Sequence, residues 1–213
     1  MDKNIIKIEE QGVLPILDIN DPELAAPLIR SVARSGISVC EVVFRYDCSE
    51  TIYRIMKDAC PEMSLGAGTI IAEGQAARAG SMGAEFLISP GFDAELVGQI
   101  LGMGYTPIPG VSSASEVQIA TKLGLEAVKL FPAGLLGGLE LVEALSAPFP
   151  KMKYIPTNGV DLGNIKKYSA NRNILACAGT FPAPPQLIVQ KRWDDISRMC
   201  EAAMTLAQLG RNH

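Results

Sequence analysis

Short runs of apolar residues recur along the chain, and their starting points lie 20 to 27 residues apart. Runs of this length that are rich in β-branched and aromatic residues are typical of buried strands. Eight can be marked, and they start near Leu14, Val39, Leu65, Phe86, Thr106, Ala127, Tyr154 and Ile174. The longer segments between them predict helices over residues 22–35, 50–59, 73–82, 94–102, 114–123, 139–145, 162–168 and 193–209.

Helix-end signals support two of these helices in particular. Asp21 is a suitable N-cap for the helix over 22–35, Pro22 suits its first turn, and Gly36 follows its end. Within that helix Pro27 is expected to cause a bend. The helix over 114–123 begins with Ser113 and Glu116 in the spacing of a capping box.

Regular alternation of strand and helix implies parallel strands joined by right-handed crossovers. Eight such units predict an α/β fold, a single (β/α)8 TIM barrel domain over 1–213, with residues 1–12 as an extra helix over its bottom. The alternative is an open doubly wound sheet. Against it, the first strand-to-helix turn, Asp18–Asp21, has no glycine-rich phosphate loop.

Composition narrows the possible functions. With 48% hydrophobic residues, 20% charged residues and a net charge of −4, the chain has the composition of an ordinary globular domain without a nucleic-acid partner. Its first residues are too charged for a signal sequence or a membrane span, so we expect a cytoplasmic protein. The five cysteines contain no C-x-x-C pair, which indicates reduced thiols.

The only histidine is His213, the last residue, which we expect to be frayed. Catalysis by a Ser-His-Asp or Cys-His arrangement therefore has no base. Metal sites built on histidine lose their main ligand, which argues against chemistry assisted by histidine-bound zinc. The sequence predicts neither a metal nor a cofactor.

Charged residues occur within two of the predicted strands. Strand alternation places Glu41 and Arg45 on the inner face of the second strand, and Lys129 on the inner face of the sixth together with Phe131. Charges inside a barrel are costly unless they are paired or functional. Desolvation disfavours the ammonium form of a lysine, and a neutral amine is a nucleophile. Two alternatives are a lysine that snorkels to water and a purely structural ion-pair network.

The predicted strands end in small or hydroxyl residues, and these ends form the functional face of a barrel. Gly66–Thr69 allows a ligand to approach the backbone closely, and Ile88–Gly91 and Pro107–Gly110 are turns. The ends at 156–159 and 178–180 occupy the usual phosphate site. Together these groups predict Schiff-base chemistry on a phosphorylated 2-keto acid.

Eight segments in register resemble the 2-keto-3-deoxy-6-phosphogluconate (KDPG) / 4-hydroxy-2-oxoglutarate (KHG) aldolases. They are Leu14–Leu17, Glu41–Arg45, Gly66–Thr69, Ile88–Gly91, Ile108–Ser112, Lys129–Ala133, Pro156–Val160 and Ala178–Thr180. The resemblance implies a class I lyase with a barrel fold that splits its sugar acid reversibly into pyruvate and glyceraldehyde 3-phosphate. It also implies a homotrimer.

Carried over by position, the family's Schiff-base lysine falls on Lys129 and its acid/base glutamate on Glu41. Arg45 and Thr69 match its carboxylate-binding residues, and the predicted pocket also includes Pro90 and Phe131. The predicted phosphate-binding residues are Thr157, Asn158, Gly159, Gly179 and Thr180.

The sequence departs from the family at three positions. Asn158 stands where the family usually has a glycine, Thr180 stands for a serine, and Gly134 stands for an acidic residue. The preference between phosphorylated and unphosphorylated substrates therefore stays open. So do two other functions, a phosphosugar epimerase or isomerase on a similar small barrel and a non-catalytic ligand-binding barrel.

Overall fold

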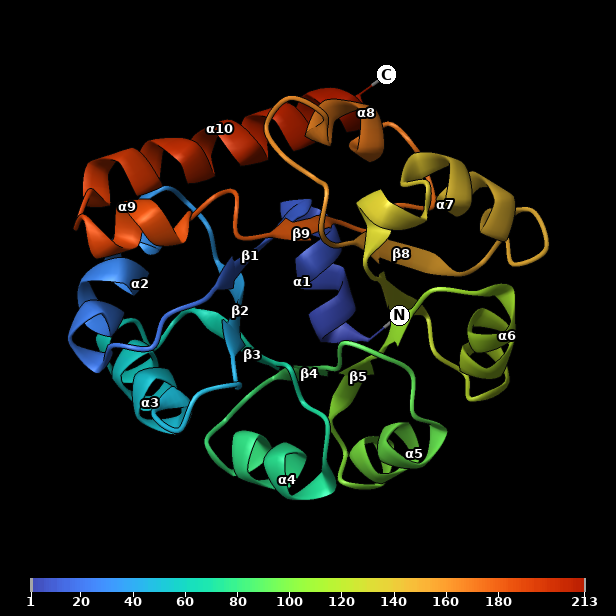
Figure 1. The fold of residues 1–213 in the computed structure, drawn as a ribbon, viewed down its shortest axis with the longest axis horizontal. Coiled ribbons are helices and arrows are strands. Elements are labelled where there is room, and N and C mark those ends of the chain that lie inside the picture. Colours follow the sequence, from blue (N-terminus) through green and yellow to red (C-terminus); the bar gives the residue numbers. More distant parts are fainter. Residues whose placement is uncertain (1, 213) are drawn as a thin grey trace.

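The computed structural model describes residues 2–212, in which parallel strands alternate with helices around a ring (Figure 1). The strands are β1 (Val13–Leu17), β2 (Val39–Val43), β3 (Ser64–Gly68), β4 (Phe86–Ile88), β5 (Thr106–Ile108), β6 (Gly110–Val111), β7 (Ala127–Leu130), β8 (Lys153–Pro156) and β9 (Cys177–Gly179). The helices are α1 (Lys3–Gln11), α2 (Ala25–Arg34), α3 (Ser49–Ala59), α4 (Glu73–Ser81), α5 (Ala94–Gly102), α6 (Ala114–Lys122), α7 (Leu139–Ser146), α8 (Ile165–Ser169), α9 (Pro185–Val189) and α10 (Trp193–Arg211). Two 3-10 turns, η1 (Pro22–Leu24) and η2 (Ala133–Leu136), complete the set.

The strands form a curled parallel sheet in two hydrogen-bonded parts. One part has the order β5-β4-β3-β2-β1-β9, and the other has the order β6-β7-β8. Pro109 separates β5 from β6, which are two halves of one broken strand, because proline has no N–H to donate to a ladder. Bridges from Tyr154 to Ile174 and from Thr157 to Ala178 join β8 to the β9 segment. The structure thus confirms the predicted barrel.

Side chains divide into an interior core and a shell, as the alternation along the strands predicts. Val43 and Ala127 belong to the interior cluster, together with residues of β1, β4 and β8. Val42 and Val128, their neighbours along the strands, belong to the cluster between the strands and the surrounding helices. This division confirms that Glu41 and Lys129 face the inside of the ring.

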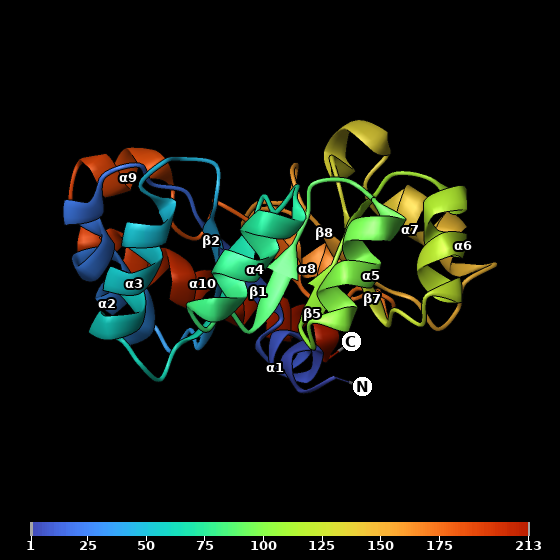
Figure 2. The ribbon, with the colours of Figure 1, turned by 90° about the horizontal axis from the view of Figure 1, so that it is seen from below.

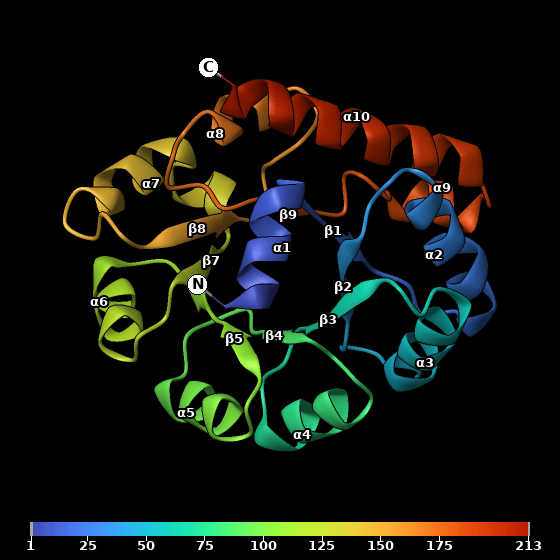
Figure 3. The ribbon, with the colours of Figure 1, turned by 180° about the vertical axis from the view of Figure 1, so that it is seen from behind.

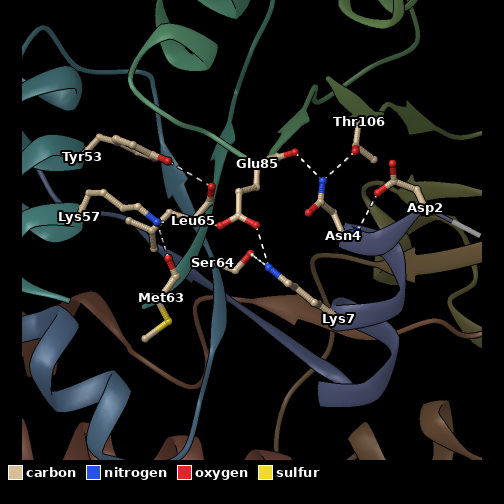
Figure 4. A network of polar contacts seen from close by, with 10 residues as sticks. All are labelled: Asp2, Asn4, Lys7, Tyr53, Lys57, Met63, Ser64, Leu65, Glu85 and Thr106. Carbon is tan, nitrogen blue, oxygen red and sulfur yellow. Dashed lines mark hydrogen bonds and ion pairs between the residues drawn. The ribbon is translucent and has the colours of Figure 1, made fainter. Parts of the chain in front are cut away.

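Helix α1 lies across the N-terminal ends of the strands and closes that end of the barrel (Figures 2 and 3). Asn4 donates to the carbonyl of Glu85 and to the Thr106 hydroxyl, and Lys7 forms an ion pair with Glu85 at 2.8 Å (Figure 4). Gln11 donates to the carbonyls of β1 and β2. The open end of the barrel is therefore the one where the strands finish.

The helix predicted after the first strand is one place where the structure corrects the sequence prediction. Instead of one helix over 22–35, η1 precedes α2, which begins at Ala25. Pro27 consequently lies in the first turn of α2, where its missing N–H removes no helical hydrogen bond. The predicted cap holds, since the Asp21 carboxylate accepts from the N–H of Glu23 at 2.9 Å.

Other corrections concern the last quarter of the chain. The helix predicted over 162–168 begins only at Ile165, because Asp161 accepts from the N–H groups of Gly163 and Asn164 and forms a turn there. The strand predicted from Ile174 begins at Cys177, after the single bridge at Ile174. Helix α9 was not predicted at all.

None of the helices within residues 2–212 combines the length and the apolar character that a membrane span needs.

All five cysteines are free, as predicted. Burial raises the pKa of the Cys177 and Cys200 thiols to about 12, so both stay protonated at neutral pH. His213, the predicted frayed end, lies outside the described residues.

Candidate active site

A cavity of about 680 Å³ opens at the C-terminal ends of the strands. It brings together every side chain and backbone segment predicted for the site, namely Glu41, Arg45, Thr69, Pro90, Lys129, Phe131, Thr157, Asn158, Gly159, Gly179 and Thr180. These residues come from six different strands or the loops that follow them. Such convergence at this end of the barrel is typical of an active site.

Glu41 and Lys129 form a buried pair at the bottom of the cavity. Glu41 is 2% exposed and Lys129 is 7% exposed, and Lys129 Nζ lies 3.7 Å from Glu41 Oε1. Lys129 Nζ also lies 5.5 Å from the centre of the Phe131 ring. Of the pair's neighbours, Gly68 is notable, because a Cβ built on it would lie 1.8 Å from Glu41 Oε1. A glycine there leaves room for the carboxylate.

The electrostatics of Glu41 fit a group that exchanges protons. Burial raises the pKa of the Glu41 carboxyl above its usual range, and the nearby Lys129 ammonium acts in the opposite direction. Glu41 Oε2 is buried and has no hydrogen-bond partner among the described residues. A buried carboxyl with a raised pKa and a free oxygen is suited to taking and returning protons within the cavity.

Backbone hydrogen bonds on both sides hold Lys129 in place. It is paired in register with Gly110 of β6 and with Ile155 of β8, and its N–H donates to the carbonyl of Pro109 at 2.9 Å. Glu41 is likewise central, between Ile16 of β1 and Gly66 of β3. Both groups therefore stand on rigid interior strands, which keeps their separation well defined.

Arg45 and Thr69 lie at the mouth of the cavity. The Arg45 side chain is 49% exposed, so it lies at the solvated rim and not deep inside the barrel as the alternation alone suggested. Thr69 has a φ of 63°, a left-handed conformation that is rare for a β-branched residue. Backbone strain of this kind tends to occur at functional sites, and Thr69 lines the cavity.

The predicted phosphate end is built from the loops after β8 and β9. Asn158 and Gly159 have φ values of 71° and 87°, and asparagine is one of the few residues other than glycine that adopts this conformation readily. Asn158 thus preserves a turn suited to glycine. Within residues 2–212 no acceptor is paired with the backbone N–H groups of Gly159 and Thr180. The Thr157 hydroxyl donates to the carbonyl of Ile155 at 3.2 Å.

Six residues of the cavity wall were not predicted from the sequence: Ile16, Val160, Phe181, Pro184, Pro185 and Gln186. The inner-face alternation of β1 points to Ile16, so that signal was present. The others lie in loops and in α9, for which the sequence pattern predicted no strand or helix position.

Among the described residues, no group of three or more His, Cys, Asp or Glu side chains could hold a metal ion.

Comparison with known proteins identifies the family. The sequence model of the family described as KDPG and KHG aldolase matches residues 4–199. The chain belongs to this aldolase family. It is 34% identical over 199 residues to the 2-dehydro-3-deoxy-phosphogluconate aldolase of Treponema pallidum, covering 93% of this chain and 95% of that one. It is 30% identical over 197 residues to the KHG/KDPG aldolase of Escherichia coli K12, with 92% of each chain covered.

Solved structures of aldolases agree with the fold. The KDPG aldolase of Legionella pneumophila, with pyruvate captured as a covalent carbinolamine intermediate, superposes with a TM-score of 0.91 at 31% identity, covering 95% of this chain and 98% of that one. The KDPG aldolase of Zymomonas mobilis with 3-phosphoglycerate gives 0.88 at 29% identity, with 95% of each chain covered. The predicted fold and the predicted family are both confirmed.

Proposed function

We propose that this aldolase is a class I enzyme that cleaves KDPG to pyruvate and glyceraldehyde 3-phosphate through a Schiff base on Lys129. The observation that carries the proposal is the buried Lys129–Glu41 pair, 3.7 Å apart, within the cavity. A relative that captures pyruvate as a covalent carbinolamine supports the same chemistry. Cleavage of 4-hydroxy-2-oxoglutarate to pyruvate and glyoxylate is a second proposed activity, because one relative is a KHG/KDPG aldolase.

Lys129 supplies the nucleophile. Its neutral amine adds to the keto carbon of the substrate, the resulting carbinolamine loses water, and a protonated imine remains. When the bond between the third and fourth carbons of the sugar acid breaks, its electron pair moves toward the imine nitrogen and gives an enamine. The aldehyde leaves at this point. Protonation of the enamine carbon and hydrolysis then release pyruvate and restore the amine of Lys129.

Glu41 moves the protons in these steps. As a carboxylate it takes the proton of the hydroxyl on the fourth carbon while the carbon–carbon bond breaks, and as an acid it returns a proton to the enamine carbon. Both tasks require a group whose pKa is closer to neutrality than that of an exposed glutamate, and burial shifts the pKa of Glu41 in that direction. Its unpaired Oε2 is the oxygen available to the substrate.

The remaining cavity residues bind the two ends of the substrate. Arg45 and Thr69 receive the carboxylate, since a guanidinium and a hydroxyl both donate to carboxylate oxygens. Pro90 and Phe131 form apolar walls beside the keto carbon. The phosphate is received by the backbone N–H groups of Gly159 and Thr180, which are unpaired within residues 2–212, by the hydroxyl of Thr180 and by the amide of Asn158, while Thr157 and Gly179 complete the wall of this end.

Borohydride trapping tests this proposal directly. Sodium borohydride reduces an imine to a stable secondary amine, so treatment with pyruvate should add one carboxyethyl group per chain, located by peptide mapping on the peptide that contains Lys129. An epimerase, an isomerase or a binding barrel needs no amine and gives no adduct. The absence of an adduct, or an adduct on Lys122 of α6, would contradict the assignment.

Thr180→Ala tests the phosphate end. Loss of a hydroxyl that donates to a charged oxygen should weaken the binding free energy of KDPG by about 1.5–3 kcal/mol and raise its KM correspondingly. Cleavage of 4-hydroxy-2-oxoglutarate, which carries no phosphate, should change little. Steady-state kinetics on the two substrates provide the comparison. Equal losses on both, or a wild-type preference for the unphosphorylated substrate, would move the natural substrate toward 4-hydroxy-2-oxoglutarate.

Assembly into a homotrimer is also proposed, on the basis of the family resemblance alone. Sedimentation equilibrium of the purified chain would decide it, with a mass of three chains as the expected result.

A further inference from the structure

Arg45 lines two cavities. Besides the substrate cavity, it lines a second cavity of about 410 Å³, and Thr69 is also part of both walls. The wall of the second cavity includes two acidic residues, Asp47 and Glu50, and Glu50 forms an ion pair with Arg78 at 2.7 Å. A half-exposed arginine has many accessible rotamers. A guanidinium that serves the substrate cavity therefore needs a partner that limits these rotamers.

Asp18 is placed to do this. It follows β1 directly, and strand alternation continues the inner face of Leu14 and Ile16 to this position. Asp18 Oδ2 lies 3.4 Å from Arg45 Nη2, and the Asp18 side chain is only 19% exposed. The interaction thus connects the residue after β1 with Arg45 in the loop after β2.

Tyr46 orients the Asp18 carboxylate. The Tyr46 hydroxyl donates to Asp18 Oδ1 at 2.9 Å, which leaves Oδ2 directed to Arg45. The Arg45 guanidinium carbon also lies 6.0 Å from the centre of the Tyr46 ring, within the range of a cation–π contact. Both oxygens of the carboxylate are therefore engaged, one by each of two successive residues of the loop after β2.

We propose that Asp18, oriented by Tyr46, is a positioning residue that holds the Arg45 guanidinium in the substrate cavity for the carboxylate of the keto acid. This role rests on the proposed function of Arg45. A guanidinium has five N–H donors, and Asp18 engages Nη2, which leaves other donors for the substrate. The rotamer entropy that Arg45 otherwise loses on substrate binding is lost in advance, which lowers the cost of binding.

A competing effect has the opposite sign. The Asp18 carboxylate and the substrate carboxylate repel one another near the same guanidinium, which weakens binding. This repulsion is reduced because the positive charge of Arg45 lies between them and because the mouth of the cavity is solvated. We therefore expect positioning to outweigh repulsion, and the two effects predict opposite changes in KM.

Kinetics of Asp18 variants distinguish these effects. Asp18→Ala should raise KM for KDPG roughly tenfold and leave kcat within about threefold, because Arg45 acts in binding and not in bond breaking. Asp18→Asn keeps one acceptor oxygen, which can serve Tyr46 or Arg45 but not both, so its increase in KM should be smaller than that of Asp18→Ala. Asp47→Ala is the matched control, since Asp47 is an exposed acid of the same loop without a hydrogen bond or ion pair among the described residues. Because Asp47 lines the second cavity and not the substrate cavity, its loss should not raise KM.

Two further measurements separate positioning from general support of the fold. In an Arg45→Ala background, Asp18→Ala should have no additional effect, whereas independent effects would multiply. The second measurement is borohydride trapping of the wild-type and Asp18→Ala proteins, once with pyruvate and once with ethyl pyruvate. Ethyl pyruvate has no free carboxylate. The concentration needed for half-maximal trapping should rise for pyruvate only.

An unchanged or lowered KM in Asp18→Ala would overturn the proposal, as would an equal loss of trapping with pyruvate and ethyl pyruvate. Wild-type trapping with pyruvate serves as the reference in every arm. If the wild type forms no adduct, the proposed function itself fails. If it forms one and the Asp18 variants behave like the wild type, only the role of Asp18 fails.

Discussion

Lys129→Met is expected to abolish KDPG cleavage, with a loss of kcat on the order of 10⁴–10⁶-fold, as when a covalent nucleophile is removed. Methionine has a similar length and suits the apolar strand, but it offers no amine to the keto carbon. Steady-state assays should show residual activity near background, and borohydride with pyruvate should leave the mass of the protein unchanged.

The variant should still fold. Removing Lys129 takes away the charge that opposes the rise of the Glu41 pKa, so the Glu41 carboxyl takes up a proton more readily and no unpaired charge is left buried. Thermal unfolding monitored by circular dichroism checks this point. Lys122→Met, which removes an exposed lysine at the end of α6, is the control and should keep wild-type activity. Retention of cleavage and trapping in Lys129→Met would rule out the proposed nucleophile.

The parts of the fold that the sequence predicts are those with strong local signals. Helix α5 occupies the predicted residues Ala94–Gly102, because Asp93 caps its first turn and accepts from two backbone N–H groups. Helix α9 was missed because five residues that begin with a proline are too short to show a helical period. The predicted fifth strand ends in a turn at Pro107–Gly110, so the prediction missed that the strand resumes after Pro109 as the two-residue β6, which is too short to show a pattern.

The same limit applies to the candidate site. Glu41 and Lys129 could be predicted because alternation within one strand fixes which way each side chain points. The contacts of Asp18 with Arg45 and Tyr46 could not, because they depend on the stagger between neighbouring strands and on the path of the loop after β2. Local patterns therefore identify which residues face the cavity, and the tertiary structure is needed to show which of them touch.

Glu41→Gln is expected to separate proton transfer from imine formation. Glutamine has nearly the same shape as glutamate but cannot take up a proton, so kcat should fall by roughly 10²–10⁴-fold. Lys129 remains in place, and borohydride with pyruvate should still modify it. Loss of trapping together with activity would show that Glu41 holds Lys129 in position and does not itself move protons.

The pH profile gives an independent check on the same carboxyl. Because burial places the pKa of Glu41 above its usual value of 4.5, the carboxylate that acts as base is lost as the pH falls through that raised pKa. In the wild type, kcat/KM should thus decrease on the acidic side at a pH higher than an exposed glutamate would give. The Glu41→Gln variant has no carboxyl to protonate, so its residual activity should lack this acidic decrease. An identical acidic limb in both proteins would assign the titration to another group and leave Glu41 without its proposed role as the base.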